Sequence, residues 1–169
     1  MKSKIAAGVA AGLIAGIIFT LLAQFITTTA PDGERTSLLI TAATAIHSHW
    51  RMAGWIASLV YSVAIGGFFG WLLRTQTQTL REMPLMFWGG LYGIAWWVLS
   101  GLIVVPVLHG SVPLSSDALA VMRPVIFLSL PEHVVYGVIL GFAFARITTY
   151  LNRRRRRAHA PTNPSRRAA

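Results

Sequence analysis

The sequence contains no cysteine and few acidic residues. Its 169 residues include 15 Lys and Arg but only 5 Asp and Glu. The absence of cysteine excludes disulfides, thiolate metal sites and thiol nucleophiles. The hydrolase motifs G-x-S-x-G and H-E-x-x-H are also absent, as is a phosphate-binding glycine loop. We therefore expect no enzyme, no catalytic residue and no cofactor.

Apolar residues are abundant. They make up 54% of the chain, against 12% charged residues, which is outside the range of ordinary soluble domains. Four runs are long enough to span a bilayer, which takes about 20 apolar residues: 5–26, 52–73, 85–107 and 125–150. The sequence predicts an all-α integral membrane protein with four transmembrane helices.

The first run follows two lysines, Lys2 and Lys4, an order that is also typical of a secretory signal peptide. The run is about twice the usual length of a signal-peptide apolar region. No Ala-x-Ala cleavage site lies between its end and Pro31. We therefore expect it to remain as the first span.

The positive charges predict the orientation. Most Lys and Arg residues lie at the two ends of the chain and in the loop at 74–81, whereas Arg35, Arg51 and Arg123 fall on the other side. By the positive-inside rule, both termini are cytoplasmic. We expect a multi-pass protein of the bacterial cytoplasmic (inner) membrane.

The membrane domain is predicted to cover 1–151 and to be followed by a disordered, arginine-rich cytoplasmic tail at 152–169. The tail opens with Arg153, Arg154, Arg155, Arg156 and Arg157. These arginines are expected to touch anionic lipid. No aromatic or fold context supports nucleic-acid binding.

The two loops on the outer side are each predicted to hold a helix. Apolar residues at helical spacing over 38–50, after Thr36 as a plausible N-cap, predict an amphipathic interfacial helix that leads into the second span. In the second loop, cap candidates at 115–117 predict one short helix that stops at Pro124.

Glycines spaced for helix packing run through all four spans. Small residues four apart let a neighbouring backbone approach closely in a membrane. The predicted packing glycines are Gly8, Gly12, Gly16, Gly66, Gly70, Gly89, Gly93, Gly137 and Gly141. They predict a tightly packed four-helix bundle of the glycine-zipper kind and a possible homo-oligomer.

The second and fourth spans resemble each other. LVYSVAIGGFF at 59–69 aligns without a gap with VVYGVILGFAF at 134–144. A weaker match sets Gly8 and Gly12 against Gly89 and Gly93 in the first and third spans. Together these matches predict two repeated helical hairpins of the same orientation.

Polar residues are predicted to gather in the outer half of the spans, whereas the glycines fall in the inner half. At about 1.5 Å per residue, Thr20, Ser58 and Ser100 lie near the depth of Glu132. Polar side chains in a membrane must bond to each other or to water. We therefore expect a polar vestibule that opens outward, with these candidate site residues: Glu132, His133, Tyr136, Tyr61, Ser58 and Ser129.

Glu132 is the central candidate because an ionisable group in hydrocarbon is a functional hypothesis by default. It would titrate a proton or bind a small cation. The alternative is a structural carboxyl that is hydrogen-bonded to Tyr61, Ser58 or His133.

A metal held by Glu132, His133 and an outer-loop histidine stays open, although no metal site is expected. His47 and His49 point to different helix faces, and His133 has no partner at matching depth for haem.

Short motifs in the second half carry a family resemblance. PVLHGSVP at 106–113 and EHVVYG at 132–137, after Gly89-Gly90-Leu91, resemble the YagU-like family of small bacterial inner-membrane proteins. That family has no known molecular function and is associated with acid resistance. The resemblance implies His133 as the family's helix-borne histidine and Pro106 and Gly110 as a loop corner. This chain differs in its shorter first loop and longer arginine tail.

Two functions follow from the sequence. The first is a membrane protein that senses or conducts protons or a small cation through Glu132. The second is a non-catalytic structural or accessory membrane subunit, in which the intramembrane polar residues are packing contacts.

Overall fold

The structure is a computed structural model that describes residues 2–29, 35–44, 46–75, 82–108, 110 and 112–158. The elements, in chain order, are α1 (Lys2–Phe25), β1 (Thr27–Thr29), β2 (Arg35–Ser37), α2 (Leu38–Thr44), α3 (Arg51–Leu72), a 3-10 turn (Leu73–Thr75), α4 (Glu82–Leu99), a π-helical turn (Ser100–Val104), α5 (Val105–Leu108) and α6 (Ser116–Ala158). Four helical segments are long and apolar enough to cross a membrane, as the sequence predicts: Ser3–Phe25, Arg51–Thr75, Glu82–Val104 and Phe127–Ala158.

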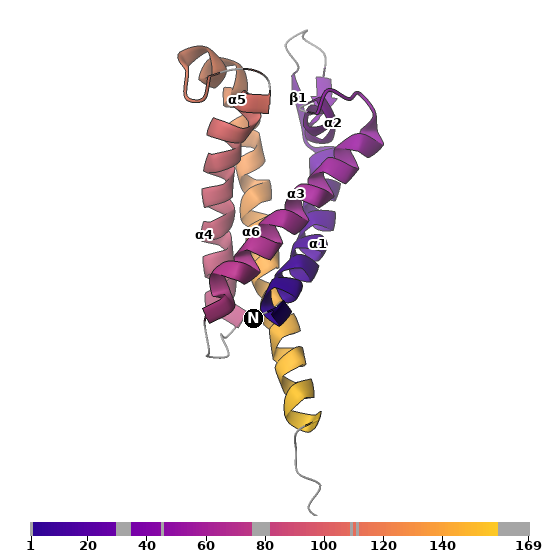
Figure 1. Ribbon diagram of the computed structural model, residues 1–169. Helices are drawn as coiled ribbons and strands as arrows, with labels where there is room; N and C mark the ends of the chain where they lie inside the picture. The colour runs from indigo at the N-terminus through magenta and orange to yellow at the C-terminus, as the bar shows by residue number, and fades with distance from the viewer. Residues whose placement is uncertain are drawn as a thin grey trace, which may run out of the picture.

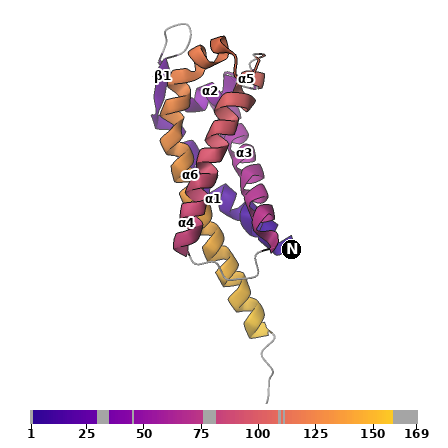
Figure 2. The same ribbon diagram turned by 90° about the vertical axis from the view of Figure 1, so that its left-hand side faces the viewer.

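The four long helices form two antiparallel pairs. α1 packs on α3, α4 packs on α6, and α1 also contacts α6. Both connections within a pair lie at the end of the bundle opposite the N-terminus (Figure 1). We call α1 with α3 the first hairpin and α4 with α6 the second hairpin. α6 extends beyond the other helices at the N-terminal end of the bundle, as Figures 1 and 2 show.

Glycines hold the first hairpin together. A Cβ atom at Gly12 would meet the carbonyl oxygen of Ser62 at 2.6 Å and the Cα of Gly66 at 2.9 Å. A Cβ at Gly66 would run into the carbonyl oxygen of Gly8. The α1 and α3 backbones are therefore in direct contact, which only glycine permits at these positions.

The second hairpin repeats this packing. A Cβ atom at Gly89 would run into the carbonyl oxygen of Gly137 and lie 3.1 Å from the amide nitrogen of Gly141. A Cβ at Gly141 would run into the carbonyl oxygen of Leu85. Because Ser62 aligns with Gly137 and Gly66 with Gly141, these contacts match those of the first hairpin one for one.

The contacts correct one part of the predicted repeat. Gly89 occupies the place of Gly12, and Leu85 occupies the place of Gly8. Gly12 and Gly16 therefore correspond to Gly89 and Gly93, one helical turn away from the weaker sequence match. Gly8, Gly12 and Gly16 of α1 are spaced four residues apart. The sequence therefore allows either Gly8 and Gly12 or Gly12 and Gly16 to align with Gly89 and Gly93, and the packing selects the second alignment.

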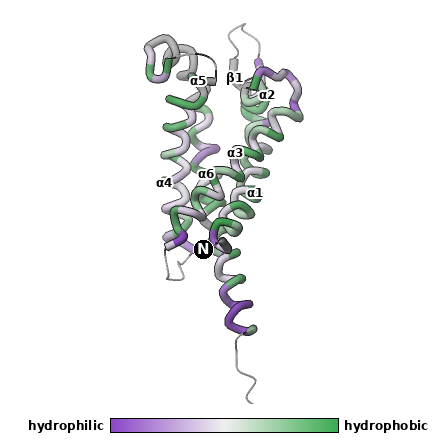
Figure 3. The backbone as a smooth tube through the Cα atoms, in the orientation of Figure 1, coloured by the Kyte–Doolittle hydropathy of each residue, from purple (hydrophilic) through white to green (hydrophobic). Residues whose placement is uncertain are grey.

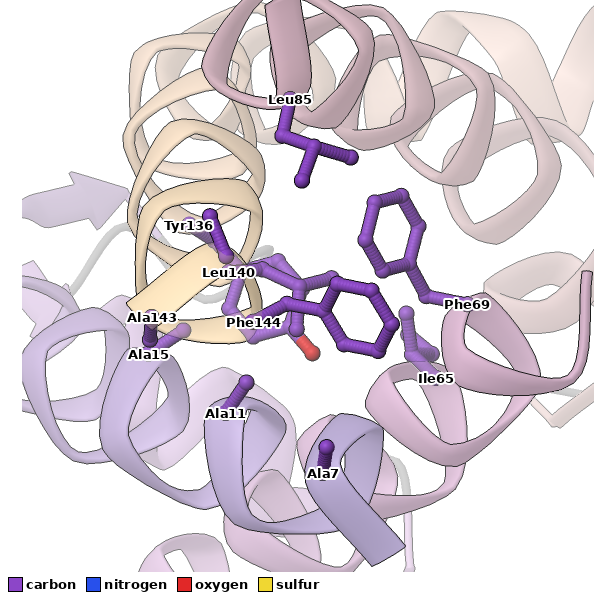
Figure 4. Close-up of a cluster of buried hydrophobic side chains, with 11 residues drawn as sticks. Ala7, Ala11, Ala15, Ile65, Phe69, Leu85, Tyr136, Leu140, Ala143 and Phe144 are labelled. Carbon is purple, nitrogen blue, oxygen red and sulfur yellow. The ribbon is translucent and has the colours of Figure 1, made fainter. Parts of the chain in front are cut away.

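The two hairpins meet along α1 and α6. Figure 4 shows Ala7, Ala11 and Ala15 of α1 facing Tyr136, Leu140 and Ala143 of α6, with Phe69 and Leu85 closing the same cluster. All three alanines are fully buried. Their small size lets α1 lie close to α6, so the core consists largely of α6 side chains over an alanine stripe.

Three segments differ from the prediction. α2 has only 7 residues, and the Ile40 amide bonds to Ser37 Oγ at 3.4 Å instead of Thr36 serving as the cap. The prediction of a short helix that stops at Pro124 is wrong, because α6 continues through Pro124 and Pro131. Neighbouring groups can satisfy the backbone carbonyl that a proline leaves without a donor inside a helix. α6 also carries the five arginines as helix to Ala158, whereas disorder was expected from 152.

Candidate functional site

Glu132 lies inside the bundle, partway along α6. Figure 3 shows a hydrophilic stretch in this part of α6 between apolar segments. The residue is only 2% exposed, so its carboxyl group is closed off from the surface in this conformation. Its Oε1 atom has no hydrogen-bond partner among the described residues. A buried oxygen without a donor costs about 1 to 3 kcal/mol, so this position requires an explanation.

Tyr61 shares this feature. Its hydroxyl group is buried and likewise has no hydrogen-bond partner in the described part of the chain. Glu132 is therefore not bonded to Tyr61, which is one of the three partners that a structural carboxyl was expected to have. The Tyr61 ring packs edge to face on Trp96 of α4, with centroids 6.1 Å apart.

His133 joins α6 to α4. Its Nδ1 atom lies 2.8 Å from the carbonyl oxygen of Ser129, and its Nε2 atom lies 3.4 Å from Ser100 Oγ. The Ser100 hydroxyl donates to the carbonyl oxygen of Trp96 at 2.6 Å. Ser100 is also the first residue of the π-helical turn, a local widening that often marks functional positions in helices.

Tyr136 and Tyr92 link the helices through their hydroxyl groups. Tyr136, one turn from Glu132, donates to the carbonyl oxygen of Ser62 at 2.7 Å. Tyr92 of α4 donates to the carbonyl oxygen of Ile65 at 2.7 Å. Tyr92 was not among the predicted site residues. Its signal in the sequence is only an aromatic residue beside Gly93, which does not separate it from lipid-facing aromatics.

The remaining candidates lie around this cluster. Ser58 is buried on α3, and Ser129 is partly buried one turn before His133. Thr20 is buried on α1, where its hydroxyl donates to the carbonyl oxygen of Gly16 at 2.7 Å. Phe19 packs edge to face on both His133 and Tyr136, with centroids 5.2 Å and 5.8 Å away. α1 therefore offers an aromatic wall to the site but no ionisable group.

The loop histidines are apart from Glu132. His47 and His49 are exposed between α2 and α3, and His109 falls outside the described residues. His47 has a φ of 57°, which ends the local helix before the second span. Within the parts of the chain that the structure describes, no three His, Cys, Asp or Glu side chains form a group that could hold a metal ion.

Comparison of the chain with family models, with curated proteins and with solved structures finds no match.

Proposed function

We propose that this chain is a four-span protein of the bacterial cytoplasmic membrane. Large apolar side chains are exposed on all four long helices, among them Leu13 and Ile17 on α1, Val60 on α3 and Phe87 on α4. In water such surfaces would aggregate, whereas in a bilayer they face lipid tails. The membrane supplies the partner that these surfaces need.

The distribution of charge supports cytoplasmic termini. Lys4 donates to the carbonyl oxygen of Leu73 at 3.1 Å, so the start of α1 and the end of α3 lie together. Arg146 pairs with Glu82 at 3.3 Å at the start of α4. This end of the bundle also carries the arginine run of α6. By the positive-inside rule it faces the cytoplasm.

At the centre of the proposal is Glu132 as a binding site for a proton or a small cation. The observation that carries it is the buried Oε1 atom without a hydrogen-bond partner. A buried carboxyl with one oxygen left without a donor gains from a proton or cation, and a membrane interior makes this gain large. The predicted outward vestibule would be the route to it, and the covered carboxyl then represents a closed state.

The second proposal is a structural or accessory membrane subunit without transport. The hydroxyl bonds of Tyr136 and Tyr92 favour it, because both tie helices together and need no ligand. The same account fails at Glu132, whose Oε1 has no partner to lock the helices through. Packing therefore accounts for the tyrosines and leaves the carboxyl unexplained.

Three further properties belong to the proposal. The two hairpins would be an internal duplication, since the contacts of Gly12 and Gly66 in the first correspond to those of Gly89 and Gly141 in the second. The exposed arginines at the end of α6 would bind anionic lipid headgroups. Membership of the YagU-like family rests on the sequence motifs alone.

The experiment is flux into liposomes that contain the purified protein. Wild type, Glu132→Gln and the surface control Glu82→Gln are compared across about pH 4 to 8, where carboxyl and imidazole groups titrate. We expect proton or cation flux with wild type and Glu82→Gln and none with Glu132→Gln. Equal flux from all three folded proteins, or no flux from any, would remove the conduction proposal and leave sensing or a structural role.

A further inference from the structure

The correspondence between the hairpins gives Glu132, His133 and Ser100 each a smaller counterpart in the first hairpin. With Gly12 matched to Gly89, Ser100 corresponds to Ala23 of α1. With Gly66 matched to Gly141, His133 corresponds to Ser58 and Glu132 to Ala57. The first hairpin therefore packs with small residues where the second carries an acid, an imidazole and a hydroxyl. Packing alone does not require these three side chains.

The match extends to the aromatic neighbours, so the register is not an accident of glycines. Phe19 meets Tyr136 edge to face between α1 and α6, with an interplanar angle of 77°. The corresponding residues, Trp96 and Tyr61, meet edge to face between α4 and α3 at 87°. The matching glycines and these ring pairs form a packing arrangement that both hairpins have, which we call the shared frame. The polar residues of the second hairpin are additions to this frame.

The contacts of His133 leave Nε2 as the ring nitrogen that can take up a proton. A carbonyl only accepts, so the 2.8 Å contact with the Ser129 oxygen requires a hydrogen on Nδ1. The Ser100 hydroxyl can donate to the Trp96 carbonyl at 2.6 Å or to the Trp97 carbonyl at 3.3 Å, and its oxygen lies 3.4 Å from Nε2. In the neutral ring, Nε2 can only accept from Ser100. In the protonated ring, Nε2 carries a hydrogen that Ser100 Oγ can accept while its own hydrogen stays on a carbonyl.

We propose that His133 is a proton-binding site in which Nε2 takes a proton from water and donates it to Ser100 Oγ, tying α6 to the π-helical turn of α4. One N–H bond forms from the Nε2 lone pair while one O–H bond of a hydronium ion breaks and releases a water molecule, and no bond within the protein breaks. The bond is charge-assisted and therefore stronger than a bond between neutral groups. This proposal rests on the proposed function only in that His133 lies in the same part of the bundle as Glu132. It names the proton as the ligand of that region.

The groups that the structure places against His133 come from three helices. α6 contributes the Ser129 carbonyl, α4 contributes the Ser100 hydroxyl, and α1 contributes the Phe19 ring. None of these is ionisable. The nearest ionisable residues along α6 are Glu132, which precedes His133 in the sequence, and Tyr136, which has Tyr61 of α3 and Tyr92 of α4 as its own neighbours.

The test is nitrogen NMR of the imidazole ring, because ring nitrogen shifts report both the tautomer and the charge. The protein carries 5 histidines, so His47, His49, His109 and His159 are replaced by Asn to leave His133 alone. The ring is followed in lipid nanodiscs from about pH 4 to 8, the range in which imidazole titrates. We expect the neutral form to carry its hydrogen on Nδ1 and the acid form to carry hydrogens on both nitrogens.

The matched variants come from the first hairpin. Ser100→Ala installs the residue found at the corresponding position 23, so the frame tolerates it, and it removes the acceptor. We expect the proton affinity of His133 to fall about tenfold, a midpoint shift of about one pH unit. Ser100→Thr keeps a hydroxyl and restores the wild-type midpoint.

Two results would overturn the inference: a neutral ring with its hydrogen on Nε2, or the same titration midpoint in wild type and Ser100→Ala. The outcome is independent of flux. A His133 that titrates as expected in a protein without Glu132-dependent flux would retain this site and remove the conduction proposal. The reverse result would retain conduction and remove this site.

Discussion

The two hairpins share a packing frame but differ in what they add to it. Both bring their helices into backbone contact at matching glycines, Gly12 on Gly66 in one and Gly89 on Gly141 in the other. Only the second hairpin carries an acid and a histidine inside this frame. The first hairpin therefore acts as an internal control, because it shows which residues the fold needs and which it does not.

The faces by which the hairpins meet also differ. α1 presents Ala7, Ala11 and Ala15 to α6, whereas the corresponding positions of α4 are Pro84, Trp88 and Tyr92. α4 therefore reaches α3 through side chains, with Tyr92 against Phe69 at 5.0 Å between centroids. Small residues make the interface between α1 and α6 close, and aromatic residues make the interface between α3 and α4 wider.

The largest expected effect breaks the shared frame. Gly12→Ala and Gly89→Ala, at corresponding positions, each place a Cβ against a backbone carbonyl of the partner helix, so we expect a loss of about 2 to 3 kcal/mol of unfolding free energy in both. By contrast, Gly67 of α3 and Gly90 of α4 meet only a valine side chain at 3.3 Å. Gly67→Ala and Gly90→Ala are the controls and should cost far less. The measurement is unfolding in mixed micelles, followed by tryptophan fluorescence.

If only one glycine of the pair is sensitive, the two hairpins do not share a frame, and the comparison fails. Equal sensitivity at the control positions would show that the loss comes from glycine itself and not from backbone contact.

The next effect tests the close interface. Ala11→Leu adds three carbons where α1 faces α6, so we expect a loss of about 2 kcal/mol from overpacking. Ala10→Leu makes the same change on the exposed side of α1 and should leave stability within about 0.5 kcal/mol of wild type. Equal unfolding midpoints for the two variants would contradict the alanine-stripe account.

A smaller effect separates the two matching tyrosines. Tyr136→Phe removes a buried bond to the Ser62 carbonyl and should cost about 1 kcal/mol. Tyr61→Phe removes a buried hydroxyl that has no partner, so stability should stay unchanged or rise. The same unfolding assay measures both. The account is wrong if Tyr61→Phe is the more damaging change.

The smallest effect concerns the acid. Glu132→Ala installs the residue of the first hairpin at position 57. Because no hydrogen bond to Oε1 is lost and the cost of burying it is relieved, we expect the unfolding free energy at neutral pH to stay unchanged or to rise by up to about 1 kcal/mol. A loss of several kcal/mol would mean that Glu132 locks the bundle, and the structural-subunit proposal would gain.

The sequence predicts the parts of the fold that depend on composition and spacing. The four apolar helices follow from length, and the match of the second and fourth spans follows from Tyr61 and Tyr136 with their glycines. The one-turn register of α1 against α4 could not be predicted, because glycines at equal spacing fit two alignments. The continuity of α6 through Pro124 was not predicted, because proline often ends a helix but does not have to when neighbouring groups satisfy the freed backbone carbonyl.

The sequence names candidate site residues but does not predict the hydrogen bonds that they make. Placing Ser100 near the depth of Glu132 anticipated its contact with His133. The bond of Tyr92 to the Ile65 carbonyl depends on how α3 and α4 cross, which spacing does not specify. The lack of a partner at Glu132 Oε1 likewise depends on side-chain directions in three helices. The sequence allows Tyr61, Ser58 and His133 as hydrogen-bond partners of Glu132 but gives no basis for choosing among them.

The most direct measurement is infrared difference spectroscopy of the purified protein in lipid between neutral and acid pH. The chain has only 5 acidic residues, so a protonated carboxyl band can be assigned by single substitutions. The account predicts a carbonyl-stretch band, shifted as in an apolar environment, that disappears in Glu132→Gln and persists in Glu82→Gln. Identical spectra for wild type and Glu132→Gln across the pH range would contradict it.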